Sequence, residues 1–281
     1  MKKFIFEKSN PEWSGNDILN ELDNFCDLYE NRPIKNNKGG MLFQQMFSFF
    51  FLLKRLKPKL IIESGVYKGQ STWLIENTLP NSEIISLDID LSQREYISKK
   101  AIYSSKDFRF HDFSKIPENT LVFFDDHVNH VERLIESKFF NIKNIVLEDN
   151  YLPGKGDFQT LKQLYNNYVF NHNPGILSLI KTNIFFNKII FKKIFNKNYN
   201  VKIDIDKISK RVRDGNVDES WFENINKIID CYYEFPPLIK YEDLTDDEFV
   251  KKPLFNSMPD NLKNYLNSSK EYNFLTYLRL N

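Results

Sequence analysis

The stretch KLIIESGVYKGQSTWLIENTLPNSEIISLDID, residues Lys59–Asp90, decides the fold expected of this chain. Its first apolar residues, Leu60–Ile62, have the composition of a buried parallel strand, and two glycines then interrupt the apolar pattern. A helix is expected over Ser71–Thr78 and a second strand over Ile84–Asp88. Strand, glycine loop, helix and strand in this order predict a Rossmann-like α/β fold with a doubly wound, mostly parallel sheet.

The loop between the first strand and the helix has the form of a nucleotide-cofactor cradle. Gly65 allows a sharp turn, Gly69 allows a ligand or a strand to approach closely, and Ser71 or Thr72 is expected to cap the helix. The spacing differs from the G-x-G-x-x-G pattern of dinucleotide-binding folds, because Tyr67 stands where the middle glycine is required. The loop therefore argues against a nicotinamide cofactor.

An acid two residues before the first glycine completes a second pattern. The run from Glu63 to Gly69 resembles the first motif of class I S-adenosylmethionine-dependent methyltransferases, in the variant that lacks the middle glycine. The resemblance implies that S-adenosylmethionine is the cofactor and that this segment binds it through Glu63, Gly65, Tyr67, Gly69 and Ser71.

The ends of the next two strands carry further cofactor contacts in that family. The resemblance implies that the acid ending the second strand, Asp88, holds the ribose hydroxyls, with Asp90 as the alternative. An ionised carboxylate suits this role because it accepts two hydrogen bonds from a diol. A third strand is expected at Phe108–Phe110, so that Asp112 would approach the adenine amino group; a solvated turn acid is the other interpretation.

Two later apolar runs end in pairs of acids, Asp125 with Asp126 and Glu148 with Asp149. Ligands of open parallel sheets bind beyond the carboxyl ends of the strands, so these acids are expected to converge beside the glycine loop. Four carboxylates repel one another unless a cation lies between them. Oxygen ligands favour a hard cation such as Mg²⁺, or else Mn²⁺ or Ca²⁺.

Acids at these two strand ends also resemble those of metal-dependent O-methyltransferases of the catechol, cephalosporin-hydroxylase-like and macrolide-sugar types. The resemblance implies that Asp125 or Asp126 binds the metal together with Glu148 and Asp149, and Asn150 replaces Glu148 in the catechol-type register. It also implies methyl transfer to a hydroxyl of a sugar or of a natural-product small molecule. Strand-end acids can instead cap helices or pair with lysines.

The general base of the reaction is not obvious from the sequence. The catalytic lysine of the catechol enzymes is missing, because Val128 and Asn129 occupy the two matching positions. His127 is the candidate base, since a neutral imidazole accepts a proton near pH 7. His127 and His130 have spacing that can bind zinc, but a third ligand is lacking and a structural role for His130 is preferred.

Composition excludes several other classes. The 281 residues include 39 basic and 38 acidic side chains, a net charge of +1 that does not indicate a nucleic-acid partner. Two cysteines, Cys26 and Cys231, do not form a disulfide framework. We find neither a secretory leader nor an apolar run of membrane-spanning length, so a cytoplasmic protein is expected.

The chain is expected to divide into four parts: an N-terminal helical cap at 1–58, the cofactor-binding core at 59–158, a helical insertion or lid at 159–233, and a closing segment at 234–281. Glycines 154 and 156 are a candidate hinge for the lid. The basic, apolar stretch 176–197 is interpreted as a lid or homo-oligomer contact, with a membrane-surface helix as the alternative.

Three further elements are expected outside the core. One amphipathic helix is predicted over residues 15–31, another helix over Trp221–Tyr233, and an edge strand over Phe274–Leu280. Two other functions remain open at the level of sequence. One is a metal-independent methyltransferase of the same fold, and the other is a module that binds the cofactor without catalysis.

Overall fold

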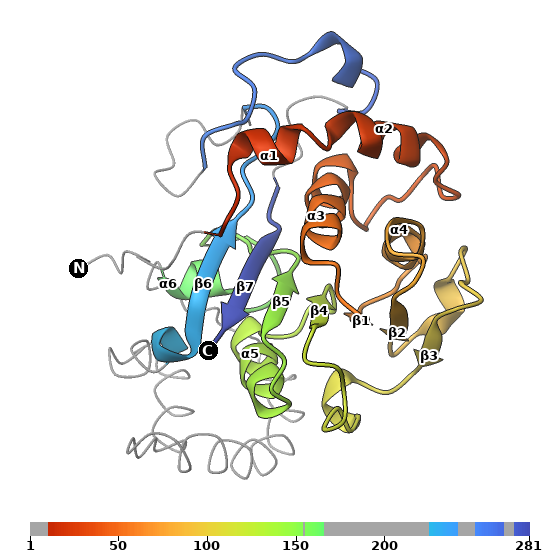
Figure 1. Ribbon diagram of the computed structural model, residues 1–281, viewed down its shortest axis with the longest axis vertical. Coiled ribbons are helices and arrows are strands. Elements are labelled where there is room, and N and C mark those ends of the chain that lie inside the picture. Colours follow the sequence, from red (N-terminus) through yellow and green to blue (C-terminus); the bar gives the residue numbers. More distant parts are fainter. Residues whose placement is uncertain (1–10, 154, 166–224, 241–250, 267–272) are drawn as a thin grey trace.

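A single seven-stranded sheet organises the protein (Figure 1). The computed structural model describes residues 11–153, 155–165, 225–240, 251–266 and 273–281. The strand order is β3-β2-β1-β4-β5-β7-β6, and β7 runs antiparallel to both of its neighbours while the other pairs are parallel. The strands are β1 (Leu60–Ser64), β2 (Glu83–Leu87), β3 (Ile102–Ser104), β4 (Thr120–Phe124), β5 (Asn144–Leu147), β6 (Ile229–Glu234) and β7 (Thr276–Leu280).

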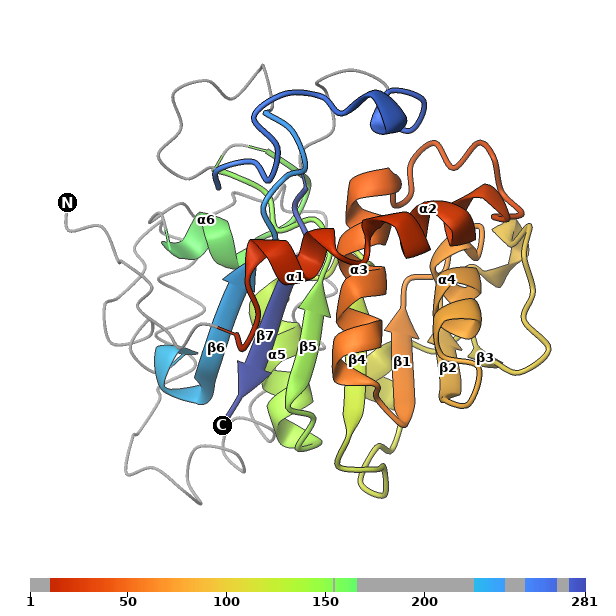
Figure 2. The same cartoon turned by 45° about the horizontal axis from the view of Figure 1, so that its top comes forward.

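Helices cover both faces of the sheet (Figure 2). One face packs against α1 (Gly15–Leu19), α2 (Leu22–Glu30), α3 (Phe43–Leu56) and α4 (Gln70–Thr78), and the other against α5 (His130–Phe139) and α6 (Leu161–Tyr165). Successive residues of β4 point to opposite faces of the sheet and so belong to different cores. Phe123 stacks on Phe49 of α3, with the ring centroids 4.4 Å apart, whereas Val122 and Phe124 face α5. This arrangement confirms the predicted doubly wound α/β fold.

The N-terminal segment forms two helices, so the prediction of one helix over residues 15–31 is wrong. Ser14 and Asp17 form a capping box at the start of α1, and α2 begins at Leu22 without a side-chain cap. With α1 and α2 as separate helices, Ile18 of α1 and Phe25 of α2 are both buried in the same core as α3. The long apolar helix α3 ends at Leu56, just before β1.

The third strand lies earlier in the chain than predicted. Residues Phe108–Phe110 form a short 3₁₀ helix, η2, because the Asp107 side chain accepts the Arg109 amide and closes the turn. Phe108 is buried as a core residue, whereas Phe110 is exposed. The actual β3 is an exposed edge strand, and Ile102 faces solvent, so its sequence lacks the apolar signature of the inner strands.

Two predictions for the C-terminal region need correction. Residues 225–228 are helical, but residues 229–233 of the predicted helix Trp221–Tyr233 form β6 together with Glu234; Ile229 and Cys231 are both buried, which is the alternation of a strand. The predicted strand Phe274–Leu280 exists as β7, but it lies between β5 and β6 and is not an edge. Tyr277 belongs to one core and Leu278 to the other, as an inner strand requires.

Most of the predicted insertion, including 176–197 and the possible hinge residue at 154, lies outside the described residues. Within the described part of the chain, no helix combines the length and apolarity needed to cross a membrane. The other short helices are η1 (Leu91–Gln93) and η4 (Asp260–Leu262).

Candidate functional site

The glycine loop packs against the chain's own backbone. Gly65 has a φ of +98°, and a Cβ there would lie 2.0 Å from the carbonyl oxygen of Asp125, so the loops after β1 and β4 touch at this residue. Gly69 begins α4, with a φ of +91°, and a Cβ would lie 2.4 Å from the Tyr96 carbonyl oxygen. Both glycines are therefore required by close approach of backbone as well as by positive φ.

Glu63, on β1, stabilises the region beneath the glycine loop by hydrogen bonds to side chains of α4 and β2. Its side chain is fully buried and accepts hydrogen bonds of 2.6 Å from the hydroxyls of Thr72 and Ser86, and it also bonds the Ser71 side chain. Burial raises the pKa of Glu63 above its ordinary value. The expected capping role of Ser71 or Thr72 is wrong, because Gly69 is the N-cap and the hydroxyls hold Glu63 instead.

A cavity of about 300 Å³ opens beyond the carboxyl ends of β1, β2 and β4, within the size range of small-molecule sites. Six of the predicted site residues line it: Gly65, Tyr67, Asp88, Asp125, Asp126 and His127. The structure does not bring Glu63, Gly69, Ser71, Asp112, Glu148 or Asp149 to the described lining. The lining also includes Gly39 and Gly40, which precede α3 in sequence.

Asp88 links the end of β2 to the glycine loop. Its Oδ2 accepts the backbone amides of Val66 and Tyr67 at 2.7 and 3.0 Å, and its Oδ1 accepts the amide of Asp90 at 2.8 Å. Between the two acids, Ile89 is 81% exposed and lines the cavity. Sequence reasoning missed Ile89, although an apolar residue between two strand-end acids was a signal available in the sequence.

The adenine-side contact predicted for Asp112 is not supported by its placement. Asp112 is exposed, and its carboxylate accepts the Ser114 amide in a local turn. Asp107, which follows the true β3, lines the cavity instead. Burial alone would raise the pKa of Asp107, but its hydrogen bond to Arg133, together with the charges of Arg133 and Arg109, lowers it to about 2. The misplaced third strand is the reason that the sequence did not indicate Asp107.

Asp126 belongs to a buried ion cluster. Its Oδ2 accepts the Ser64 hydroxyl at 2.6 Å and lies 2.7 Å from Nη2 of Arg133. The Arg133 side chain is fully buried on α5, and it also contacts Asp107 and Glu136, each at 2.7 Å. Of the two acids after β4, Asp126 therefore has a structural role, because it connects the loop after β4 to Ser64 of β1 and to Arg133 of α5.

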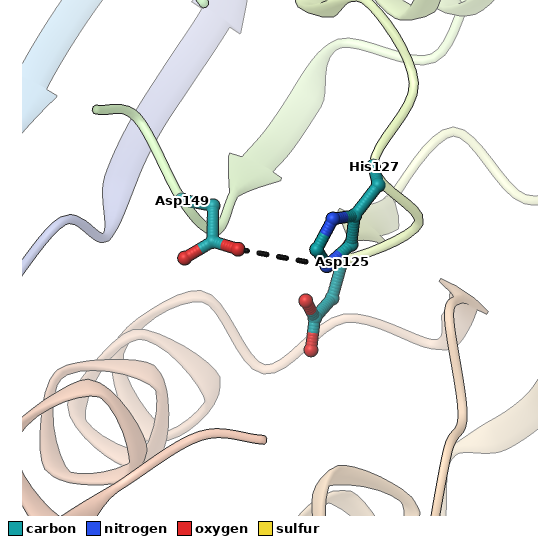
Figure 3. A group of neighbouring side chains, drawn as sticks. All are labelled: Asp125, His127 and Asp149. Carbon is teal, nitrogen blue, oxygen red and sulfur yellow. Dashed lines mark ion pairs between the residues drawn. The ribbon is translucent and has the colours of Figure 1, made fainter. Parts of the chain in front are cut away.

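Asp125, His127 and Asp149 converge at the mouth of the sheet (Figure 3). Each offers one ligand atom, and these atoms lie within 4.8 Å of one another; Nε2 of His127 is 3.8 Å from Oδ2 of Asp149. The other ring nitrogen, Nδ1, lies 3.0 and 3.2 Å from the carboxylate oxygens of Asp157. Burial, and then the charges of Asp149 and Asp126, raises the pKa of Asp125 well above its usual range.

The remaining candidates around this group have different surroundings. Glu148 is buried, and burial followed by the charge of Asp125 raises its pKa. The Asn150 amide nitrogen donates to the hydroxyls of Tyr232 and Thr276 at 2.8 and 2.9 Å, so the side chain joins β5 to β6 and β7. Asn150 is therefore a structural residue in this arrangement.

His130 also has structural surroundings, as expected from the sequence. The ring is buried, its Nδ1 accepts the Leu161 amide at 3.4 Å, and it is bonded to the backbone of Glu148. Burial lowers the pKa of His130 to about 3, so the ring is neutral at physiological pH. The cluster formed by Asp125, His127 and Asp149 does not include His130.

The sheet topology now separates two cofactor-binding folds. A dinucleotide-binding sheet has the parallel order 3-2-1-4-5-6, whereas here an antiparallel strand enters between β5 and β6. The chain has the fold of class I S-adenosylmethionine-dependent methyltransferases. The position of β7 thus distinguishes this sheet from that of a dinucleotide-binding fold.

Solved structures resemble this chain only at low sequence identity. No family model matches the chain, and no curated protein matches its sequence. Among solved structures, the chain is similar to CmcI with S-adenosylhomocysteine (SAH), at 16% identity, a TM-score of 0.35, and coverage of 52% of this chain and 80% of CmcI.

Two further likenesses are of the same order. The SAH-bound Podospora anserina methyltransferase PaMTH1 is 14% identical, with a TM-score of 0.32 and coverage of 48% of this chain and 62% of that chain. The N-terminal domain of EvdMO1, solved in the presence of SAH and D-fucose, is 17% identical, with a TM-score of 0.33 and coverage of 51% and 70%. The strand order assigns the fold.

Proposed function

We propose that this protein is an S-adenosylmethionine-dependent methyltransferase that transfers the methyl group to a hydroxyl oxygen. The observation that carries the proposal is the position of the cavity. It lies beyond the carboxyl ends of β1, β2 and β4, and the glycine loop and Asp88 both line it, in a sheet with the class I methyltransferase strand order.

The cofactor would lie along the glycine loop. The Asp88 carboxylate already accepts three backbone amides, and the remaining lone-pair site, on Oδ1, can accept one ribose hydroxyl. The exposed Ile89 offers an apolar face to a flat ring, and Tyr67 borders the same cavity. Carboxylates at the mouth also suit the positive charge of a sulfonium ion.

A divalent cation fits the acids at the mouth. Asp125 and Asp149 come from neighbouring strand ends, their ligand atoms converge with that of His127, and burial followed by the charge of Asp149 raises the pKa of Asp125. A cation between them removes this repulsion. The ion predicted from the acidic ligands is Mg²⁺, and when bound it would polarise the acceptor hydroxyl.

The acceptor is proposed to be a sugar or natural-product small molecule with two adjacent oxygens, because such a pair suits chelation beside the carboxylates. The protein's own contribution is positional. The loop and Asp88 would hold the cofactor while the strand-end residues orient the acceptor oxygen in line with the methyl group, which accounts for much of the rate gain in transfer reactions.

Cofactor binding can be measured without knowing the acceptor. Titration calorimetry should show binding of S-adenosylhomocysteine and no binding of NADH. The Asp88→Ala variant should bind S-adenosylhomocysteine at least about 10-fold more weakly, since a charged hydrogen bond contributes about 1.5–3 kcal/mol. Asp112→Ala is the matched control, because Asp112 is exposed and bonded only within its own turn, and it should bind as the unaltered protein does. Binding of NADH in preference to S-adenosylhomocysteine would overturn the proposal.

Methyl transfer is tested with labelled S-adenosylmethionine against a panel of catechols and methyl glycosides. Transfer that stops on addition of EDTA and returns with a divalent cation supports the metal-assisted reaction. Transfer that survives EDTA identifies a metal-independent methyltransferase of the same fold. Cofactor binding without transfer to any acceptor of the panel, with or without metal, would favour the non-catalytic module.

A further inference from the structure

We propose that His127 is a metal ligand and not the general base, and that the set formed by Asp125, His127 and Asp149 selects a first-row transition ion such as Mn²⁺ over Mg²⁺. The inference rests on the proposed function, because it assigns the ligands and the ion of the same site. It rests on four features of these residues: the orientation of the imidazole, the spacing of the ligand atoms, the backbone conformation and the chemistry of the donors.

Asp157 orients the imidazole. Both carboxylate oxygens of Asp157 lie within hydrogen-bonding distance of Nδ1, at 3.0 and 3.2 Å, so a neutral ring carries its proton on Nδ1 and donates it there. The lone pair of a neutral ring is then on Nε2, which faces Asp149. A carboxylate that fixes the second ring nitrogen is the usual partner of a metal-bound histidine.

The distance from His127 to Asp149 fits a shared ion better than a direct bond. At 3.8 Å, Nε2 and Oδ2 are too far apart for a hydrogen bond. Two ligand atoms that each lie about 2.0–2.2 Å from one ion are about 3–4 Å apart. A cation between the two atoms would therefore accommodate the observed spacing, and the Asp125 carboxylate lies within reach of the same position.

The backbone presents both ligands in a conformation that side chains seldom adopt. His127 has a φ of +54° and Asp149 a φ of +56°, and the two residues follow β4 and β5 closely in the chain. Left-handed backbone at a non-glycine residue is strained and persists where the surrounding structure imposes it. Both side chains are thus held toward the mouth before any ion arrives.

A nitrogen ligand changes the choice of ion. Mg²⁺ takes oxygen ligands almost exclusively, whereas imidazole suits the first-row transition ions, whose affinity for such sites rises from Mn²⁺ onward. An Nε2 that binds metal cannot take a proton from the acceptor hydroxyl. His127 would therefore position the ion, and the acidity of the acceptor would depend on the ion's charge.

The test uses the full chain and Mn²⁺ as the probe. Electron paramagnetic resonance should show stoichiometric binding of Mn²⁺ that only a large excess of Mg²⁺ displaces, and spin-echo modulation should show coupling of the bound Mn²⁺ to an imidazole ¹⁴N. The His127→Asn variant should lose this coupling and bind Mn²⁺ at least about 10-fold more weakly. Asparagine is the suitable replacement because it tolerates a positive φ.

Two further variants distinguish the effect of losing a metal ligand from the effect of changing a residue that does not bind the ion. Asp157→Ala should keep the ¹⁴N coupling but weaken Mn²⁺ binding by about 10–100-fold, the usual effect of removing the carboxylate behind a metal-bound histidine. His111→Gln should behave as the unaltered protein does, because His111 is a partly buried ring outside the cluster, which stacks on Phe113 and whose Nε2 lies near the Lys106 carbonyl. Circular dichroism establishes that each variant is folded.

The outcomes also distinguish this proposal from the proposed function. Bound Mn²⁺ without ¹⁴N coupling, coupling that survives in His127→Asn, or equal affinity for Mg²⁺ and Mn²⁺ would overturn the role of His127. Absence of Mn²⁺ binding would overturn it as well. Calorimetry with S-adenosylhomocysteine on the same samples decides independently whether the protein binds the methyltransferase cofactor.

Discussion

At the scale of single residues, the site depends on Gly65. A Cβ at this position would lie 2.0 Å from the Asp125 carbonyl oxygen, and the residue has a φ of +98°. Gly65→Ala must therefore both strain its own backbone and push the loop after β4 away from β1. We expect it to lower the free energy of unfolding by more than about 3 kcal/mol, measured by urea denaturation.

Gly39→Ala is the matched control for this substitution. Gly39 has a similar φ of +89°, but the nearest atom to an added Cβ is the Tyr67 hydroxyl at 3.7 Å. The control thus carries the conformational strain without the collision, and it should cost about 1–3 kcal/mol. If both variants lost the same free energy of unfolding, the collision of the added Cβ with the Asp125 carbonyl oxygen would have no cost of its own.

The sequence indicated which strand ends carry the site but not which acid of each pair serves it. Asp125 and Asp126 are adjacent and therefore point in different directions as the strand ends. Only the folded chain shows that Arg133 binds Asp126, which leaves Asp125 with His127 and Asp149. The role of Asp157 was equally invisible, because it lies 30 residues beyond His127 in a loop without a motif.

At the scale of elements, α5 holds the cavity together through one side chain. Arg133 lies behind the loops after β3 and β4 and forms ion pairs with Asp107, Asp126 and Glu136. Removing the guanidinium leaves Asp126 without this ion pair, while Arg109 still contacts Asp107 and Glu136 at 2.9 and 3.4 Å, and a broken buried ion pair costs about 3–5 kcal/mol. Arg133→Met should therefore destabilise the protein by at least this amount in urea denaturation.

Arg279→Met provides the comparison on β7. Its guanidinium contacts Asp230 at 2.6 Å, but both side chains are 41% exposed, and exposed pairs contribute about 0–1 kcal/mol. A loss below about 1 kcal/mol for Arg133→Met would contradict the view that this helix fixes the loops after β3 and β4 by charge.

The inner elements were predictable and the edge elements were not, for one physical reason. Strands buried on both faces, such as β1 and β4, require continuous apolar residues, and this pattern is visible in sequence. The edge strand β3 is stabilised by pairing with β2 alone and exposes Ile102, whereas the apolar Phe108 is buried in the 3₁₀ turn that follows. Apolar content therefore predicted the third strand at residues 108–110 and missed the actual strand at residues 102–104.

At the scale of the whole molecule, the order of the last two strands could not be predicted from local pattern. β6 and β7 are far apart in the chain, and β7 reaches its place by inserting between β5 and β6. Residues of β7 face both cores, yet alternation along a single strand does not reveal which strands lie beside it. The general α/β class was predictable because β1, β2 and β3 follow one another in one direction along the sheet, and β4 and β5 follow one another in the other direction from β1.

The inner position of β7 has a consequence that an edge strand would not have. Deleting residues 276–281 would remove the hydrogen-bonding partner of both β5 and β6 and open both cores at once. We expect the shortened chain to lose its cooperative urea transition and its near-ultraviolet circular dichroism. Leu278→Ala is the control, because it keeps the strand and removes one buried side chain, at a cost of about 2–5 kcal/mol with cooperativity retained. If the shortened chain instead unfolded cooperatively near the midpoint of the full protein, β7 would be as dispensable as an edge strand, and the strand order that assigns the methyltransferase fold would be wrong.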